Sequence, residues 1–402
     1  MSRIEEVVEK FTRPSNFNWH TNKLKLIETY ANCIFGGKIK TPSIVISGTK
    51  GKGSTCSVCE SILRASGLRT GLFTSPHLVS PTERIRINGR CISEDQFVST
   101  YNDLISEFRK YKLPILPFFA FQTFMSGFIF QQEKVDCLVI EVGIGGKFDW
   151  TKIYEPIAAG ITHLDYDHTG ILGKTPFSIT WNKFGIFTKN SMNFAMQQNY
   201  EFQKSLDFIS KHSGIKYQTV KAFWNSKSGL TGPCANENTS FGVKVTEEFV
   251  KNLKVKHNFK LNIDKGVKNT FIAGRFQKIR KNNINWLLDS AHTTDSIGYC
   301  YKWYNSLKNN SLDDVLIFAT TKSREPNKLL KPILNKRWKK MIYISNYNKN
   351  NNIKINGNCS YANSLKNGIK EAVSLKPNSI LVTGSLHLVG DVMKEIGYVP
   401  YL

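Results

Sequence analysis

The stretch SIVISGTKGKGST, residues 43–55, decides the fold of this chain. Residues Ser43–Ser47 form a short apolar, β-branched run that is typical of a buried parallel strand. A glycine-rich turn follows over Gly48–Ser54, and a helical pattern of apolar residues then runs to a stop at Gly67. Backbone N–H groups at such a helix start face outward, and the helix dipole adds positive potential there. The order strand, glycine turn, helix therefore predicts a phosphate-binding loop.

The loop departs from the strict pattern G-x-x-x-x-G-K-[ST] at two positions. Ile46 stands at the first glycine, and Gly53 stands where the Mg²⁺-binding hydroxyl belongs. We nevertheless expect Gly51, Lys52, Gly53 and Ser54 to bind ATP, with the Lys52 side chain on the outer phosphates. The alternative is a glycine-rich turn without a ligand. Because Gly53 has no hydroxyl, other groups must hold the magnesium ion.

The alternation of strands and helices continues along the chain. Further strands are expected at 70–73, 136–142, 157–164, 286–288, 315–319, 341–345 and 380–383, and helices at 118–132, 326–336 and 363–374. Between about 225 and 270 the pattern becomes polar and rich in lysine. The fold class is therefore α/β: residues 1–270 are expected to form a P-loop-type ATPase domain with a mainly parallel sheet, and residues 271–402 a smaller Rossmann-like α/β domain.

The composition argues against several classes of protein, namely nucleic-acid-binding, membrane-spanning and exported proteins. The 402 residues are 41% hydrophobic and carry a net charge of +24. Lysines and asparagines are spread along the chain without a basic helix, so we expect no nucleic-acid partner and interpret the charge as solvated surface that also attracts polyanions. No apolar run reaches the roughly 18 residues of a membrane helix. Residues Met1–Lys10 resemble neither a signal nor a transit peptide, so we expect the cytoplasm, although a mitochondrial form stays open. The C-x-x-C pair Cys56 and Cys59 is expected to be buried helix packing rather than a redox or zinc site.

Three polar residues come directly after predicted strands. Glu141 ends the strand DCLVIE, Ser75 follows TGLF, and His168 follows the strand that ends near Leu164. The carboxyl ends of parallel strands meet at one edge of the sheet, where ligands bind. Taken singly, His168 could be an ordinary loop hydrogen-bonding group and Ser75 the start of a turn. Together with the phosphate loop they form a candidate magnesium site.

Several longer segments carry a family resemblance. They include GTKGKGSTC (48–56), ERIRING (83–89), EKVDCLVIEVGIGG (133–146), DHTGILG (167–173) and VTGSLHLVG (382–390). In this order, over residues 43–395, they resemble the Mur ligase superfamily and within it the folylpolyglutamate synthase branch, in its eukaryotic form. The resemblance implies a carbon–nitrogen ligase that adds L-glutamate to the γ-carboxylate of a (tetrahydro)folate through an acyl phosphate, with ATP and Mg²⁺. It also implies that residues 1–270 bind ATP and folate, and that residues 271–402 form the glutamate-ligase domain.

The resemblance carries over further residue roles. It implies that Ser75, Glu141 and His168 hold magnesium, and that Lys183 is a catalytic lysine that is carbamylated, which would suit a second magnesium. The alternative for Lys183 is an ordinary surface lysine. A monovalent cation such as K⁺ also fits the expectation. The expected partners are small molecules only, namely folate, glutamate and ATP, and the expected state is a monomer.

Four expected site residues fall in the second domain. Arg275 and Asp289 match ATP contacts of the family, with guanidinium on phosphate and carboxylate on ribose; an interdomain salt bridge is the alternative for Arg275. His292 and Ser385 are candidates for binding glutamate, and His292 is counted with Lys52 and Lys183 as catalytic. The alternative for His292 is a place at a helix start, and the alternative for Ser385 is a turn.

The folate side of the expected site is less regular. Arg84 and Arg86 alternate along an expected strand, where they either meet folate carboxylates or are solvated. Ala120, Lys147 and Lys152 depart from the family pattern near this side, and Asn182, next to Lys183, stands where related sequences carry Glu or Gln. Three alternatives stay open. Dihydrofolate synthase would add glutamate to dihydropteroate in the same site, and the departures at Ala120 and Asn182 motivate an inactive ATP-binding homologue. The basic composition leaves a nucleic-acid binder.

Overall fold

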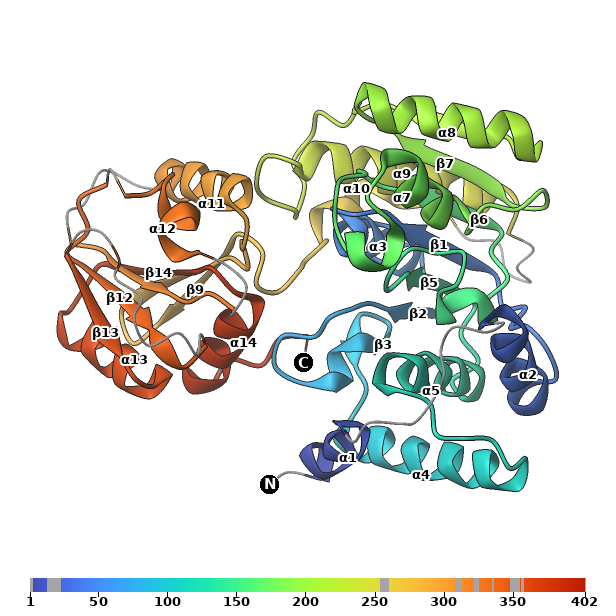
Figure 1. Ribbon diagram of the computed structural model, residues 1–402, viewed down its shortest axis with the longest axis horizontal. Coiled ribbons are helices and arrows are strands. Elements are labelled where there is room, and N and C mark those ends of the chain that lie inside the picture. The colour runs from blue at the N-terminus through green and yellow to red at the C-terminus, as the bar shows by residue number, and fades with distance from the viewer. Residues whose placement is uncertain are drawn as a thin grey trace. The chain divides into compact units, whose positions relative to one another are not determined.

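The structure is a computed structural model that describes residues 3–12, 23–253, 260–307, 313–321, 325–334, 336–347, 355 and 358–401. The chain forms two compact α/β units, each visible as a sheet with helices in Figure 1. The first unit comprises residues 1–77, 81–230 and 234–271, and the second comprises 78–80, 231–233 and 272–402. The main division lies next to the boundary expected at residue 270, but the sequence did not indicate the two short segments that join the second unit.

The first unit is built on an eight-stranded sheet. Its strands, in spatial order, are β4 (Arg90–Cys91), β3 (Ile85–Ile87), β2 (Thr70–Phe73), β5 (Cys137–Glu141), β1 (Ser43–Ser47), β6 (Ala158–Ile161), β7 (Met192–Met196) and β8 (Gln218–Val220). The run from β2 to β8 is parallel, whereas β3 and β4 are antiparallel to their neighbours. The carboxyl ends of β1, β2, β5 and β6 therefore meet at one edge.

Helices cover both faces of this sheet. They are α1 (Arg3–Thr12), α2 (Lys23–Phe35), α3 (Lys52–Ala65), α4 (Glu94–Lys110), α5 (Phe118–Gln132), α6 (Thr169–Leu172), α7 (Pro176–Phe184), α8 (Tyr200–Ser213), α9 (Ala235–Lys251) and α10 (Ile263–Lys268), with short 3₁₀ turns η1 (Pro81–Arg84) and η2 (Trp150–Ile153). Successive side chains of β1 point to opposite faces of the sheet. Ile44 and Ile46 pack with α3 and α9 on one face, and Val45 packs with α5 on the other. Figure 1 shows α4 as a further layer beyond α5.

The second unit contains a six-stranded sheet. Its spatial order is β13 (Cys359–Ala362), β12 (Lys340–Ile344), β11 (Val315–Phe318), β14 (Ser379–Thr383), β10 (Ile284–Leu288) and β9 (Gln277–Lys281), with β9 alone antiparallel. The helices are α11 (Thr294–Ser306), α12 (Pro326–Leu330), α13 (Leu365–Ser374) and α14 (Leu386–Glu395), with the turn η3 (Ser345–Tyr347). Apolar clusters form on both faces of the sheet, as in a doubly wound α/β fold.

Most predicted elements are confirmed. The bounds of β1, β2 and α5 are those expected from the sequence. The strands β5, β6, β10, β11, β12 and β14 and helix α13 are also present, with ends that differ by up to three residues. Residues Gly173–Thr175 connect α6 to α7.

The sequence pattern indicated no element over one region and placed the end of one helix too late. The polar region 225–270 contains α9 and α10, and α9 buries Phe241, Val245 and Phe249 at four-residue spacing. The asparagines and lysines between those positions obscured the helical signal. The helix expected at 326–336 ends at Leu330 and is followed by a turn.

A short strap, which we define as Leu78–Ser80, belongs to the second unit although its chain neighbours belong to the first. Leu78 and Val79 pack against the apolar cluster of the second unit. A Cβ added to Gly390 on α14 would lie 2.0 Å from the Leu78 carbonyl oxygen, and one on Gly274 would lie 2.9 Å from a Leu78 methyl group. Both glycines therefore allow the strap to approach closely.

Candidate active site

The phosphate loop joins β1 to α3 with the geometry that anion binding requires. Gly51 precedes the helix with φ 90°, a left-handed conformation that favours glycine. The first helical hydrogen bond runs from the Thr55 N–H to the Gly51 carbonyl oxygen at 2.9 Å. Helix geometry therefore provides no intrahelical carbonyl acceptor for the preceding backbone N–H groups, which are those of Gly51, Lys52, Gly53 and Ser54. These are the four residues that the sequence predicts to bind ATP, and their arrangement fits phosphate oxygens.

Neighbouring segments fix the loop. The N–H groups of Thr49 and Lys50 both donate to the His163 carbonyl oxygen, at 2.8 and 3.2 Å, which anchors the loop to the end of β6. The Lys50 ammonium pairs with Asp165 at 2.6 Å. Lys50 is thus engaged beside the loop, which leaves the phosphate role to Lys52.

Asn238 on α9 is a loop contact that sequence reasoning missed. A Cβ added to Gly51 would lie 2.2 Å from the Asn238 side-chain oxygen, so glycine is required there on steric as well as conformational grounds. The amide nitrogen of Asn238 donates to the Cys234 carbonyl oxygen at 2.8 Å, which holds the side chain in place. The signal lay in the polar stretch before Phe241, which the sequence pattern did not identify as a helix.

Glu141 and Ser75 are brought together at the same sheet edge. Glu141 ends β5, is 4% exposed, and accepts a hydrogen bond from the Ser75 N–H at 2.9 Å. A Cβ added to Gly53 would lie 3.4 Å from a Glu141 carboxylate oxygen. The carboxylate therefore stands next to the position where the strict loop pattern carries its hydroxyl. Hard oxygen ligands of this kind suit Mg²⁺, which keeps phosphate and water as its other ligands.

Lys183 is buried, contrary to the alternative of an ordinary surface lysine. It lies in the last turn of α7 with 3% exposure, and its ammonium nitrogen donates to the Gly48 carbonyl oxygen at 2.7 Å. Burial lowers the pKa of Lys183 to about 7, and the positive charge of Lys52 lowers it further, whereas Asp167 and Asp149 oppose the shift. A substantial fraction of the amine is therefore uncharged near neutral pH.

His168 is placed differently from Glu141 and Ser75. It begins α6 in a left-handed conformation with φ 48°, and its side chain is 46% exposed. Its ring nitrogen lies 3.7 Å from the Asp167 carboxylate. Across the described part of the chain no group of three His, Cys, Asp or Glu side chains is arranged to hold a metal. The expected set contains only two such residues, so phosphate oxygens would have to complete it.

Arg84 and Arg86 do not alternate along one strand, and neither is solvated. Arg84 lies in the turn η1, donates to His77 Nδ1 at 2.9 Å, and stands 5.1 Å from the centre of the Phe118 ring. Burial lowers the pKa of Arg84 to about 10, while Glu141 and Glu83 oppose the shift. Arg86 lies in β3, is 5% exposed, and donates to Thr74 at 2.9 Å. Tertiary packing therefore buries both guanidinium groups in the first unit.

Arg275 and Asp289 are neighbours within the second unit. Asp289 is 2% exposed, and its two oxygens accept from the N–H groups of Phe276 and Ala291, both at 2.9 Å. Burial raises the pKa of Asp289, and Arg275 and the two backbone hydrogen bonds oppose the shift. The Asp289 carboxylate thus fixes the turn that presents the exposed Arg275 side chain. A ribose contact of Asp289 stays a prediction.

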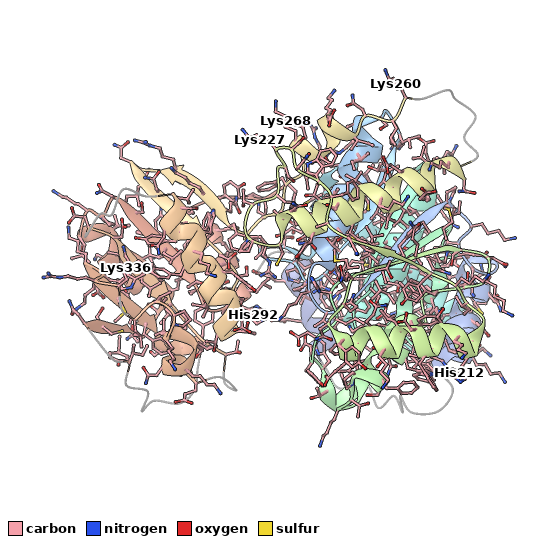
Figure 2. The ribbon with its side chains drawn as sticks, turned by 90° about the horizontal axis from the view of Figure 1, so that it is seen from above. His212, Lys227, Lys260, Lys268, His292 and Lys336 are labelled. Atoms are coloured by element: carbon pink, nitrogen blue, oxygen red, sulfur yellow. The ribbon has the colours of Figure 1, made fainter. Side chains whose placement is uncertain are left out.

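His292 and Ser385 also belong to the second unit. His292, labelled in Figure 2, precedes the N-cap residue Thr293 of α11, and its Nδ1 lies 2.8 Å from the Ser290 carbonyl oxygen. Ser385 is the N-cap residue of α14 and is 2% exposed, so it is a helix start rather than the turn considered as its plain alternative. Glutamate binding by either residue stays a prediction.

Surface lysines account for part of the net charge. Figure 2 shows Lys227, Lys260 and Lys268 projecting outward from the first unit, and all three are exposed.

No helix among the described residues is long and apolar enough to cross a bilayer.

The fold and the loop define a class of protein: a two-unit α/β protein whose parallel sheet carries a glycine-rich, lysine-bearing loop beside a buried carboxylate. The chain is 34% identical over 328 residues to the mitochondrial folylpolyglutamate synthase of Cricetulus griseus, which covers 72% of this chain and 56% of that protein. It is 30% identical over 417 residues to the folylpolyglutamate synthase of Saccharomyces cerevisiae, which covers 87% of this chain and 76% of the yeast protein. The chain therefore belongs to the folylpolyglutamate synthase family.

Solved structures agree on the fold. Folylpolyglutamate synthase of Mycobacterium tuberculosis, complexed with ADP and AMPPCP, superposes with a TM-score of 0.78 at 21% identity over 99% of this chain and 98% of that chain. A bifunctional folylpolyglutamate synthase/dihydrofolate synthase of Yersinia pestis, complexed with AMPPNP and a manganese ion, gives 0.76 at 22% identity over 98% of both chains. The chain spans only about half the length of the Cricetulus griseus relative. No family model matches the chain.

Proposed function

We propose that this protein is an ATP-dependent ligase that joins L-glutamate to the γ-carboxylate of a tetrahydrofolate, releasing ADP and phosphate. The observation that carries the proposal is the grouping at the edge of the first sheet. There the start of α3, the Glu141 carboxylate and the Lys183 amine surround the phosphate loop. Membership of the folylpolyglutamate synthase family supports the choice of substrates.

The residues of the loop supply the charge that phosphoryl transfer requires. The N–H groups of Gly51–Ser54 and the Lys52 ammonium would hold the phosphates of ATP, and they are preorganised by the helix start. Glu141 and Ser75, with His168, would hold Mg²⁺, which neutralises phosphate charge when bound. Nucleotide and manganese complexes of structural relatives are consistent with a divalent metal in this role. A monovalent cation such as K⁺ belongs to the same proposal.

Lys183 has the chemistry that carbamylation needs. An uncharged lysine amine attacks CO₂ and releases one proton, and the product carries an anionic oxygen pair instead of a cation. Burial and the charge of Lys52 hold the pKa of Lys183 near 7, so the required uncharged amine is available. Labelling with ¹³C-bicarbonate should give a carbamate resonance in the parent protein and none in Lys183→Met. A parent spectrum without that resonance would remove the carbamate from the proposal.

The second unit completes the proposed reaction. Arg275 would pair with phosphate and Asp289 would bind ribose, while His292 and Ser385 would position glutamate, and Arg84 in the first unit would meet folate carboxylates. We also propose, as the resemblance implies, that residues 1–270 form the ATP- and folate-binding part, that residues 271–402 form the glutamate-ligase part, and that the protein acts as a monomer. The cytoplasm is proposed from the composition of residues 1–10.

Phosphate release from Mg-ATP tests the function directly. The assay combines glutamate with either tetrahydrofolate or dihydropteroate, using the full chain. Glutamate-dependent release with tetrahydrofolate supports the proposal. Release with dihydropteroate alone would assign the protein as a dihydrofolate synthase, and release with neither despite ATP binding would assign an inactive ATP-binding homologue.

A further inference from the structure

A cavity of about 330 Å³ lies in the first unit, and the residues that line it do not include those of the phosphate loop. Its walls come from α2, from the segment after β5, from the end of α7 and from the region around the end of α8, and α7 and α8 pack side by side (Figure 1). The walls are mainly apolar and include Ile27, Phe184, Phe187 and Ile209. Its size falls at the lower end of the roughly 300–1,000 Å³ range of small-molecule sites.

Three lysines, Lys38, Lys147 and Lys152, line this cavity, and we call them the lysine cluster. Lys38 and Lys152 also line an adjoining cavity of about 250 Å³. Burial lowers the pKa of Lys152 to about 8, and the charges of Lys38 and Lys147 lower it further. The three ammonium groups therefore repel one another in a partly desolvated space.

The described residues supply no counter-charge in contact with the cluster. Glu28 lines the larger cavity and Glu155 the adjoining one, yet neither is within ion-pair distance of a cluster lysine in the described part of the chain. Confining like charges without an acidic partner is unfavourable for the fold alone. An anion that enters the cavity would relieve this repulsion.

Trp181 gives the cavity an aromatic face beside the charge. The Lys147 ammonium lies 3.5 Å from the centre of the Trp181 ring, which is a close cation–π contact. The cavity is lined by Trp181 and Phe184 of α7 and by Gly185, which follows the helix. In contrast, the Lys183 ammonium donates to the Gly48 carbonyl oxygen of the phosphate loop. One helix therefore presents different side chains to the cavity and to the loop.

We propose that the cavity between α2, α7 and α8 is a second ligand site, which binds a small aromatic dianion with its negative groups on the lysine cluster and its ring against Trp181. The ring would occupy the apolar walls, and the ammonium groups would exchange mutual repulsion for charge-assisted hydrogen bonds. The sequence pattern placed Lys147 and Lys152 near the folate side of the expected site, whereas the structure places both in the wall of this cavity. Occupation of the cavity needs neither ATP nor Lys52.

Fluorescence titration tests the site in the full chain. The probe is 8-anilinonaphthalene-1-sulfonate, added while saturating Mg-ATP and tetrahydrofolate fill the substrate sites, with phthalate as the competing aromatic dianion. We expect the probe to bind and phthalate to displace it. The double variant Lys147→Met/Lys152→Met should weaken both ligands about tenfold or more through two lost charged contacts. Lys204→Met, which removes an exposed lysine on α8 outside the cavity, should leave both affinities unchanged.

Two results would overturn the proposal. One is equal probe affinity in the parent and in a double variant whose urea unfolding midpoint shows it to be folded. The other is no probe binding once the substrates are present, which would place the probe in the substrate sites. Trp181→Phe provides a second variant: it keeps an aromatic ring, so binding should survive, whereas Trp181→Ala should weaken it.

Discussion

Replacing Lys183 by methionine should change how the stability of the protein depends on pH. The pKa of this lysine falls from 10.5 to about 7 on folding, chiefly through burial. The unfolded chain therefore binds more protons than the folded protein between these values, so the free energy of unfolding rises with pH across this window. Below pH 7 the buried lysine costs the fold its full penalty, on the order of 5 kcal/mol. Methionine keeps the apolar stem and removes the titrating group.

The magnitude can be worked for an accessible range. From pH 7 to pH 9 the parent should gain about 2 kcal/mol of unfolding free energy relative to Lys183→Met. The variant also loses the hydrogen bond to the Gly48 carbonyl oxygen. Because methionine has no titrating group, this residue adds no pH dependence to the stability of the variant. The difference between the two pH profiles therefore isolates the buried amine.

Equilibrium urea unfolding in CO₂-free buffer, followed by tryptophan fluorescence, measures both profiles. Lys204→Met is the matched control, because it removes an exposed lysine and should follow the parent within about 0.5 kcal/mol. Parallel profiles for the parent and Lys183→Met between pH 7 and pH 9 would refute the reasoning, since they would show that the folded state holds this proton normally.

Three further outcomes follow from the phosphate loop. Lys52→Ala should lower kcat of glutamate-dependent phosphate release by about 10²–10³-fold or more with the circular dichroism spectrum unchanged, and ligase activity near the parent level would remove the loop from the chemistry. Glu141→Ala should raise the Mg²⁺ concentration needed for half-maximal activity, so a metal dependence equal to that of the parent would contradict its assignment. Gly51→Ala should lower the free energy of unfolding by about 1–3 kcal/mol, because of its φ of 90° and the nearby Asn238 oxygen, as measured by urea unfolding; an unchanged midpoint would contradict that strain.

Sequence reasoning succeeded where a local pattern is also a structural unit. The apolar runs of β1 and β2 are each buried along their length, and backbone geometry favours glycine at Gly48 and Gly51 of the loop, so pattern and structure coincide there. Helix α9 was missed because its apolar residues are four apart among polar ones. Its packing against α3, which local sequence does not show, stabilises it. Arg84 was misplaced because a 3₁₀ turn has no strong sequence signal.

The chemistry of individual site residues was harder to predict than their positions. The resemblance implied that Lys183 is a catalytic lysine, but only the folded arrangement shows that it is buried and that the charge of Lys52 acts on it. Likewise, Asp289 was identified at a strand end, while its hydrogen bonds to two backbone N–H groups depend on a turn that brings Phe276 back to it. Phe276 lies 13 residues before Asp289, so no local spacing indicates that hydrogen bond.

The strap has a consequence for how the chain is made. Ribosomes synthesise proteins from the N-terminus, so Leu78 and Val79 are complete long before α14, against which the strap lies. The second unit cannot finish packing until its last helix emerges, and during that interval these two apolar residues lack their final neighbours. A gene fragment that encodes residues 272–402 would lack the strap altogether. Supplying residues 78–80 on a separate peptide would then be needed to restore the missing contacts, which makes the second unit a product of the whole chain rather than of its C-terminal third.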